Sequence, residues 1–320
     1  MRIGLLYDDI SARPNATVDE LSILESLDAV DGAVCELGHT PVWIPVPDEM
    51  DSWVDLVEHS SLDLVFNLYE GVGGDSAHEV RVAGIIELLG IPMTGCDSAT
   101  LGLARRKDRV NALLRDAGLP VPAWACVQVN RRKLYWDKFP AIVKPAAEDA
   151  SIGITQSSVA RNRRELAKAI DAAECFDRVL VQQFIEGREF NVGIVGKVVL
   201  PVNEIDFSAM PAGNWPMLSY AAKWDVGSAE DLGSEPHCPA DITDAQREQL
   251  QDLTVRAWRL VDGCGYGRVD FRMDEAGNPY ILEVNPNPDI APVAGLTRMA
   301  KAYGWEYAEL VDRIIREAVA

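Results

Sequence analysis

The sequence predicts an α/β protein in which an N-terminal domain with a parallel βαβ sheet precedes a larger mixed part. Two observations predict this class. Strands and helices alternate through the first 95 residues, an order that builds a parallel sheet. Residues 267–289 then hold two strands joined by a short turn rich in Asp, Gly and Asn, which is typical of an antiparallel hairpin.

The first segment, residues 1–95, is expected to be the N-terminal domain. A buried strand at 3–7 opens it, and an amphipathic helix at 18–37 ends at Gly38. Strands at 40–46 and 62–68 follow, and a second helix at 79–89 ends at Gly90. Glycine directly after an apolar-periodic run is a common helix stop, because it adopts the left-handed conformation without strain.

Two further segments, 96–180 and 181–320, complete the predicted organisation. In the middle segment we expect a helix that runs through Lys107 and Leu114 and ends near Gly118. A strand at 139–144, a helix at 162–173 and a strand at 178–183 follow it. The last segment is expected to hold strands at 189–195 and 198–202, a helix at 244–262, the hairpin and a C-terminal helix at 305–318.

Residues 207–240 form a long polar stretch with several glycines and prolines and no clear periodicity. A stretch of this length in a compact enzyme is usually a lid or a binding loop. Trp215, Tyr220 and Trp224 supply apolar anchors, which favours an ordered loop over a disordered one.

Composition excludes several classes of protein. The 320-residue chain is 48% apolar and 25% charged, as in soluble globular proteins. It has no apolar run of membrane-spanning length and no signal peptide, so we expect no membrane partner and a cytoplasmic location. The net charge of −20 argues against a nucleic-acid partner. Six scattered cysteines and four histidines lack zinc or disulfide spacing, which favours reduced thiols.

The hairpin at 267–289 is the strongest functional signal. Glu283 and Asn285 lie two residues apart on its second strand, so their side chains leave the same face. Asp270 on the partner strand can join them, with Arg268 beside it. Three oxygen donors on one face favour a hard divalent cation that carries phosphates. A solvated sheet surface is the alternative, but Ile281 and other apolar neighbours argue against it.

Three lysines are candidates for binding the phosphates of a nucleotide. Lys144 ends a strand beside a small-residue loop, where its ammonium and backbone N–H groups can meet phosphate oxygens. Lys107 is expected at the end of a helix with two arginines, and Lys223 lies in the polar stretch. Each alone reads as an ordinary surface lysine or as a helix-dipole partner. Together they suit a triphosphate with its divalent ions.

Glu189 follows an apolar connector after the strand at 178–183. One carboxylate in that place suits the two hydroxyl donors of a ribose, and the backbone of Gln183 and Ile185 suits an adenine edge. A solvated glutamate on a strand is the more common explanation for such a motif in isolation.

These motifs occur in an order that resembles the ATP-grasp superfamily, and within it the D-alanine–D-alanine ligase family. They are Lys107 after a helix, VKP at Lys144, EGREF at Glu189, YAAKW at Lys223, and GRVDF followed by ILEVNPNPD at 267–289. The N-terminal FNLYEGVGGD stretch is also similar, so the resemblance covers nearly the whole chain. It implies a two-part ATP-grasp fold after the N-terminal domain, with a central part at 96–180 and a C-terminal part at 181–320 whose lid is 207–240.

The resemblance implies that ATP and Mg²⁺ are bound between these two parts. Lys107 and Lys144 would hold the phosphates, Lys223 would reach the γ-phosphate, and Glu189 would bind the ribose. The adenine would meet Gln182, Gln183 and Ile185. Two Mg²⁺ ions, for which Mn²⁺ can substitute, would be held by Asp270, Glu283 and Asn285.

The chemistry that the resemblance implies is carboxylate activation. A carboxylate attacks the γ-phosphate to give an acylphosphate, which an amine then attacks. Arg268 would stabilise the oxyanion, a charge that develops only in the transition state. Arg268, Lys223 and Ser151 make up the expected catalytic set. Lid closure would exclude the water that hydrolyses an acylphosphate.

The substrate end departs from the family's pattern. The family's N-terminal glycine pair and glutamate are replaced by Tyr7-Asp8-Asp9, with Asp19 or Glu20 as the nearby acid, and its Gly-Ser-Ser loop reads Asp149-Ala150-Ser151. Glu70 stands for a histidine, Trp224 for a tyrosine, and Ala294-Gly295 for a serine–leucine pair. The expected substrate-binding residues are Asp19, Glu20, Glu70, Trp224, Asp289, Ala294 and Gly295.

These departures lead to one expected function and three alternatives. We expect an ADP-forming carboxylate–amine ligase whose substrates are a small carboxylate and an amine other than two D-alanines, because a pocket that loses its donors for a substrate group rejects that group. A genuine D-alanine–D-alanine ligase with a divergent pocket is one alternative. A phosphotransferase and a weakly catalytic nucleotide-binding protein are the others. A homodimer through the N-terminal segment is also expected from the resemblance.

Overall fold

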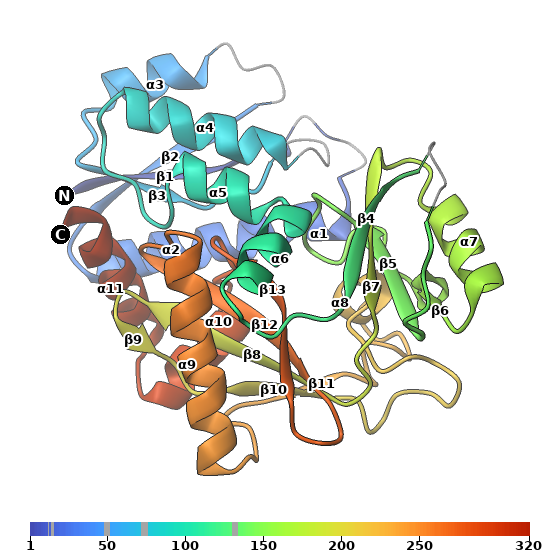
Figure 1. Ribbon diagram of the computed structural model, residues 1–320. Helices are drawn as coiled ribbons and strands as arrows, with labels where there is room; N and C mark the ends of the chain where they lie inside the picture. Colours follow the sequence, from blue (N-terminus) through green and yellow to red (C-terminus); the bar gives the residue numbers. More distant parts are fainter. Residues whose placement is uncertain (12, 14–15, 48–51, 72–75, 130–133) are drawn as a thin grey trace.

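The computed structural model describes residues 1–11, 13, 16–47, 52–71, 76–129 and 134–320. These residues form three β-sheets with helices packed around them (Figure 1). The first sheet is parallel and N-terminal, and the other two are antiparallel. The fold is therefore the mixed α/β arrangement that the sequence predicts.

The N-terminal sheet has the order β2-β1-β3, with β1 at Arg2–Asp8, β2 at Thr40–Val46 and β3 at Leu64–Asn67. Both pairings of β1 are parallel, because helices connect the strands. These helices are α1 (Val18–Leu21), α2 (Ile23–Glu36), α3 (Trp53–His59) and α4 (Ala77–Leu88). The predicted helix at 18–37 is interrupted at Ser22, whose hydroxyl donates to the carbonyl of Asp19 at 2.7 Å and competes with the helical pattern.

The second sheet has four antiparallel strands in the order β4-β7-β5-β6. Its strands are β4 (Trp124–Gln128), β5 (Ala141–Pro145), β6 (Val159–Ala160) and β7 (Arg178–Gln183). Helix α7 (Arg163–Ala172) packs on it and begins at Asn162, whose side chain accepts hydrogen bonds from two backbone N–H groups. A core of its own, which includes Val143, Leu166 and Val181, fills the space between sheet and helix.

The third sheet has the order β11-β10-β8-β12-β13, and β9 pairs with β8. The strands are β8 (Arg188–Val195), β9 (Val198–Val199), β10 (Asn203–Asp206), β11 (Glu235–His237), β12 (Tyr266–Met273) and β13 (Pro279–Asn285). The remaining α-helices are α5 (Ser98–Ala104), α6 (Lys107–Asp116), α8 (Tyr220–Trp224), α9 (Asp244–Leu260), α10 (Gly295–Tyr303) and α11 (Tyr307–Val319). The predicted hairpin is confirmed, since β12 and β13 pair antiparallel.

Some local predictions need correction. Lys107 is the first residue of α6 rather than the last of a helix, because the chain turns at Arg105 and Arg106 between α5 and α6. The predicted strand at 198–202 is only Val198–Val199. The polar stretch 207–240, called the lid segment below, is ordered and contains α8 and β11. Elements α3, β4, β6, β10 and α10 were not predicted from the sequence.

The two ends of the chain share one hydrophobic core. Ile3 and Leu5 from β1 and Leu27 from α2 pack with Leu310 and Ile314 from α11. Figure 1 accordingly shows the two termini beside each other. None of the helices in the described part of the chain is long and apolar enough to cross a membrane.

A close contact between β12 and α9 generates a first prediction. A Cβ atom on Gly267 would lie 2.2 Å from Trp258 of α9, so an alanine there must displace a buried indole or shift the strand. We expect Gly267→Ala to lower the free energy of unfolding by about 1–3 kcal/mol, measured by urea denaturation.

The matched control for this variant is Gly32→Ala. Gly32 lies in α2, and a Cβ atom there would meet nothing within 4 Å. The free energy of unfolding of this variant should stay equal or rise by up to about 1 kcal/mol, because alanine is the better helix former. Equal effects of the two substitutions would contradict the close contact at Gly267.

Candidate active site

A cavity of about 820 Å³ lies against all three sheets, within the size range of ligand sites. All predicted site residues lie in the described ranges. Lys107 is the only one of them that does not line the cavity. The predicted residues that do line the cavity are Asp19, Glu20, Glu70, Lys144, Ser151, Gln182, Gln183, Ile185, Glu189, Lys223, Trp224, Arg268, Asp270, Glu283, Asn285, Asp289, Ala294 and Gly295.

One face of the third sheet supplies the polar centre of the cavity. Alternate residues of a strand share a face, so β12 presents Arg268, Asp270 and Arg272 together. The strand register places Asp270 opposite Glu283 of β13 on one side and opposite Asn191 of β8 on the other. Arg268 lies opposite Asn285, and Arg272 opposite Glu189.

A β-bulge at Leu282 keeps this face polar. Asp270 pairs with Glu283, but the next residue, Phe271, pairs with Ile281, so Leu282 is the extra residue. The bulge changes the alternation of β13, and Ile281 is fully buried while Glu283 faces the cavity. Without it, Ile281 would share the face of Glu283 and Asn285.

Arg268 forms a bidentate ion pair with Asp270. Its Nε and Nη2 atoms lie 2.7 and 3.0 Å from the two carboxylate oxygens of Asp270. Burial alone would lower the pKa of Arg268, but the Asp270 carboxylate outweighs that effect and raises it. The side chain of Asn191 also donates to Asp270 Oδ1 at 2.8 Å. The Asp270 oxygens are thus held in place by cationic and amide donors.

Lys107 lies behind the face and pairs with two carboxylates. Its Nζ contacts Asp149 Oδ1 and Glu283 Oε1, and only 6% of its side chain is exposed. Burial would lower the pKa of Lys107, but these two carboxylates raise it, so the ammonium is firmly charged. A helix N-terminus disfavours a cation, and the two carboxylates offset this effect at Lys107, the first residue of α6.

Lys144 is the last residue but one of β5 and lines the cavity. The residue is 8% exposed, and burial lowers its pKa to about 8, although the charge of Glu283 opposes the shift. A lysine of this kind is protonated at neutral pH but loses its charge within a modest rise in pH. It can hold an anion most strongly below about pH 8.

Arg272 and Glu189 form a buried ion pair under the opposite end of the face. Arg272 Nε lies 3.2 Å from Glu189 Oε2, with side-chain exposures of 3% and 11%. Burial raises the pKa of Glu189, and Arg272 opposes that shift. Arg272 also donates to the carbonyl of Gly187 at 2.9 Å and to that of Pro216 in the lid segment. It therefore fastens the lid segment to the third sheet.

The other end of the lid segment is tied to two further parts of the protein. Trp224 Nε1 donates to the carbonyl of Ala150 at 2.9 Å, and Ser151 Oγ donates to the carbonyl of Leu218 at 3.0 Å. The Tyr220 hydroxyl donates to Asp19 Oδ1 of α1 at 2.6 Å. Helix α8, which carries Lys223, is thereby positioned over the cavity by side chains from the loop at 149–151 and from the N-terminal segment.

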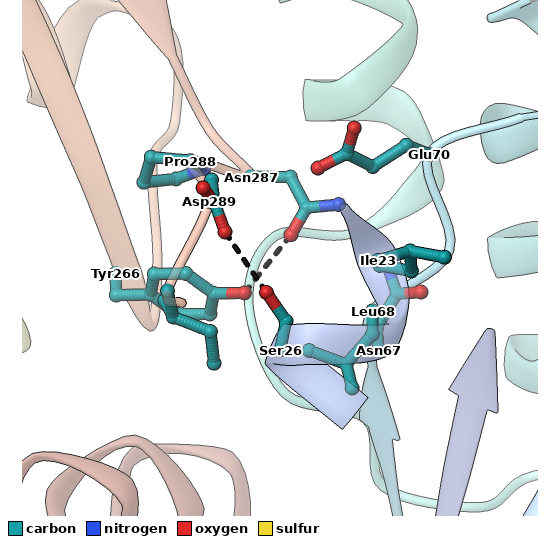
Figure 2. A pocket seen from close by; sticks show the side chains of 10 residues that line it. Ile23, Ser26, Asn67, Leu68, Glu70, Tyr266, Asn287, Pro288 and Asp289 are labelled. Atoms are coloured by element: carbon teal, nitrogen blue, oxygen red, sulfur yellow. Dashed lines mark hydrogen bonds between the residues drawn. The ribbon is translucent and has the colours of Figure 1, made fainter. Parts of the chain in front are cut away.

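The N-terminal end of the cavity is acidic. Six carboxylates and no lysine, arginine or histidine line it from the described part of residues 1–95; they are Asp8, Asp19, Glu20, Glu25, Glu70 and Glu79. Withdrawal from bulk water, aided by Asp289, raises the pKa of Glu70 to about 8. Figure 2 shows Glu70 near Asp289, which accepts a hydrogen bond from Ser26 at 3.0 Å.

Several residues of this site were not predicted from the sequence. Asn191 and Arg272 could have been found from strand alternation, since each lies two residues from a predicted site residue on its own strand. Asp8 is buried at the end of β1, where its Oδ2 accepts the backbone N–H of Glu70 at 3.2 Å. Asp149 is fixed by its contact with Lys107, which a sequence motif does not reveal.

The oxygen donors on the sheet face fit a divalent cation that is shared with phosphates. Asp270, Glu283 and Asn285 line the cavity together, and positively charged side chains already contact both carboxylates. Within the described ranges no three His, Cys, Asp or Glu side chains gather to hold a metal unaided. Mg²⁺ commonly uses one or two carboxylates and completes its shell with phosphate oxygens and water, so this donor set is sufficient.

Comparison with known proteins agrees with this geometry. A family model described as "D-ala D-ala ligase C-terminus" matches residues 113–316. The D-alanine–D-alanine ligase of Pseudoalteromonas translucida is 34% identical over 85% of each chain, and that of Gluconobacter oxydans is 32% identical over 100% of each chain. A solved D-alanine–D-alanine ligase of Bacillus anthracis has the same fold, with a TM-score of 0.81, 23% identity and coverage of 100% of this chain and 97% of that one.

The fold and these relatives define the class of the protein, an ATP-grasp enzyme that is an ATP-dependent, ADP-forming ligase and joins a carboxylate to an amine. The sequence comparison is specific within that class. The chain belongs to the D-alanine–D-alanine ligase family.

The buried Arg272–Glu189 pair generates a second prediction. Arg272→Met leaves the Glu189 carboxylate buried without its partner, so the free energy of unfolding at pH 7 should fall by about 3–5 kcal/mol. The double variant Arg272→Met/Glu189→Gln should lose less than the single variant, because it buries no unpaired charge. Urea denaturation measures both. A double variant that is less stable than the single variant would contradict a buried ion pair.

Proposed function

We propose that this enzyme joins two molecules of D-alanine, with cleavage of ATP to ADP and phosphate. The similarity to ligases named for D-alanine, over most or all of both chains, supports this proposal most directly. The altered residues at the substrate end predicted a different substrate pair. The comparisons favour the alternative, a D-alanine–D-alanine ligase with a divergent pocket.

We propose that ATP lies between the second and third sheets. Lys144 would contact the phosphates, and the carboxylate oxygen of Glu189 that faces away from Arg272 would accept a hydroxyl of the ribose. Gln182 and Ile185 would border the adenine. The N–H of Gln183 already donates to the carbonyl of Ala123 at 2.8 Å, so this residue cannot use that donor for adenine.

The metal would be held by Asp270, Glu283 and Asn285. When bound, Mg²⁺ neutralises charge on the phosphates and favours their transfer. Asp270 and Glu283 come from adjacent strands, so each could serve one of two ions, and Mn²⁺, which accepts similar oxygen ligands, would substitute. Binding would require Lys107 and Arg268 to release oxygens of these carboxylates. Lys107 would keep its contact with Asp149 and would have to move toward the cavity to contact a phosphate.

The chain's own residues would then support acyl transfer. The substrate carboxylate would attack the γ-phosphorus, with ADP leaving. The amine nitrogen would then attack the acylphosphate carbon, inorganic phosphate would leave as the C–O bond breaks, and the nitrogen would lose a proton to solvent. Arg268, at the centre of the face, would stabilise the oxyanion that forms there. Lys223, which lies on α8, would contact the transferred phosphoryl group. Ser151 would hold the loop at 149–151 beneath that group through its hydrogen bond to the carbonyl of Leu218.

The lid segment would exclude water from the acylphosphate. Its contacts through Arg272, Trp224 and Tyr220 hold it on three separate parts of the protein. A lid held at several points limits access of water during the interval between the two chemical steps. The homodimer expected from the family resemblance stays a prediction.

A second candidate function is supported by the acidic end of the cavity. Glu70 and Asp289 face the space where Ala294 and Gly295 replace a serine–leucine pair, and six carboxylates of the N-terminal segment line it. Burial raises the pKa of Glu70 to about 8, and a bound ammonium group would stabilise the ionised form of this carboxyl. The site would then favour an amino acid that carries a second ammonium group in place of one D-alanine.

A substrate assay distinguishes the two functions. Purified protein with ATP and Mg²⁺ should release ADP when D-alanine alone is added, together with an equal amount of dipeptide, and L-alanine should be inactive. D-Lysine or D-ornithine as the second amino acid is the comparison. ADP release only with a diamino acid would support the second candidate, whereas a phosphorylated carboxylate that accumulates without an amide would overturn ligation altogether.

The lowered pKa of Lys144 generates a further prediction. Lys144 is charged below about pH 8 and neutral above it, so binding of ATP should weaken as the pH rises through that value. Affinity measured by calorimetry should fall by up to about tenfold from pH 7 to pH 9. In Lys144→Arg the side chain stays charged, so the curve should be flatter even if overall affinity is lower. An equal slope in both proteins would exclude Lys144 as the titrating group.

A further inference from the structure

Two cysteines that are 168 residues apart in the sequence meet at the back of the active-site sheet. Cys96 lies just before α5, and Cys264 lies in the turn between α9 and β12. The Cys96 thiol donates to the carbonyl of Cys264 at 3.1 Å and accepts the backbone N–H of Cys264 at 3.3 Å. In return the Cys264 thiol donates to the carbonyl of Gly95 at 3.4 Å.

The backbones around the two thiols are also in close contact. A Cβ atom on Gly265 would lie 2.9 Å from the Cα of Gly95, so only glycines fit where the two segments cross. Thr100 Oγ1 donates to the carbonyl of Asp262 at 3.2 Å and holds the same segments together one turn further on. The close backbone packing of the two segments, and not only the side-chain rotamers, therefore brings the thiols together.

The two thiols differ in access to solvent. Cys96 is 2% exposed, whereas Cys264 is exposed. The hydrogen bond with the Cys96 thiol, supported by the N–H of Asp97, lowers the pKa of Cys264 despite partial burial. A thiol with a lowered pKa and access to solvent is the more reactive partner, and a buried neighbour is in place to displace what binds to it.

We propose that Cys264 and Cys96 form a thiol–disulfide site, in which a small-molecule disulfide oxidises Cys264 and Cys96 then closes an intramolecular bond. All six cysteines are free thiols in the structure. Cys35 and Cys175 are exposed, but no contact between them and a second thiol is present in the described part of the chain. They serve as internal controls.

The exchange takes place in two balanced steps. Cys264 loses its proton to solvent, and its thiolate attacks one sulfur of the small disulfide, which releases one thiolate and leaves a mixed disulfide on Cys264. Cys96 then attacks Cys264 Sγ, its proton goes to solvent, and the second small thiolate leaves. Two protein thiols are oxidised to one disulfide, and one small disulfide is reduced to two thiols.

The bond would connect two segments that lead into the active site. Cys96 precedes the helices that bring in Lys107, and Cys264 lies four residues before Arg268. Oxidation would therefore lock the start of β12 to the segment before α5 without involving a residue that lines the cavity.

The test is incubation of the full-length reduced protein with glutathione disulfide, followed by alkylation and peptide mass spectrometry. We expect a Cys96–Cys264 cross-linked peptide, four remaining thiols out of six, and a faster band on a non-reducing gel that dithiothreitol reverses. Cys264→Ser should abolish the cross-link and the band shift. Cys175→Ser should keep the cross-link and the band shift, because Cys175 is exposed but is not one of the two thiols proposed to react.

Two results would overturn the proposal. One is a protein that gains only mixed disulfides with glutathione, with no Cys96–Cys264 peptide. The other is a band shift that survives in Cys264→Ser, which would show that a different pair reacts. Both variants replace thiols outside the cavity, and circular dichroism confirms that each is folded before the comparison is made.

Discussion

The register of β12 between β8 and β13 decides which side chains meet in the active site. Val269 and Phe271 are fully buried, and they alternate with Arg268, Asp270 and Arg272 on the cavity side. A slip of one residue would move the apolar pair into the cavity and three charged groups into the core. The hydrophobic core therefore fixes the positions of Arg268 and Asp270, the groups proposed to meet the oxyanion and the metal, although neither belongs to the core.

The same face balances its own charges before any ligand arrives. Arg268 holds Asp270, Lys107 holds Glu283, and Arg272 holds Glu189. The first two pairs occupy carboxylates that the proposed metal would need, so ATP with its metal would exchange partners with these groups rather than fill an empty site. The third pair lies at the lid segment and has no such competitor. Ligand binding would therefore replace the first two ion pairs, whereas the third pair would stay in place.

The parts of this structure that depend on local sequence pattern could be predicted from the sequence. The hairpin, its three oxygen donors and the strand at Arg178–Gln183 follow from alternation and turn chemistry. Prediction from the sequence failed where contacts between residues far apart in the chain determine the structure. The break between α5 and α6, at Arg105 and Arg106, has no glycine or proline, and the contacts of Lys107 with Asp149 and Glu283 join residues far apart in the sequence. The Arg272–Glu189 pair depends on the register between β8 and β12, which no local signal specifies.

The distribution of hydrophobic cores has a consequence for motion. Residues from β1 and α2 share a core with α11, and residues near α5 share another with β8 and β12. The second sheet and α7 have a separate core. Relative displacement therefore costs least between this unit and the remainder of the molecule. Entry of nucleotide and release of product would then proceed by the second sheet swinging on its connections, while the N-terminal segment and the third sheet travel as one body.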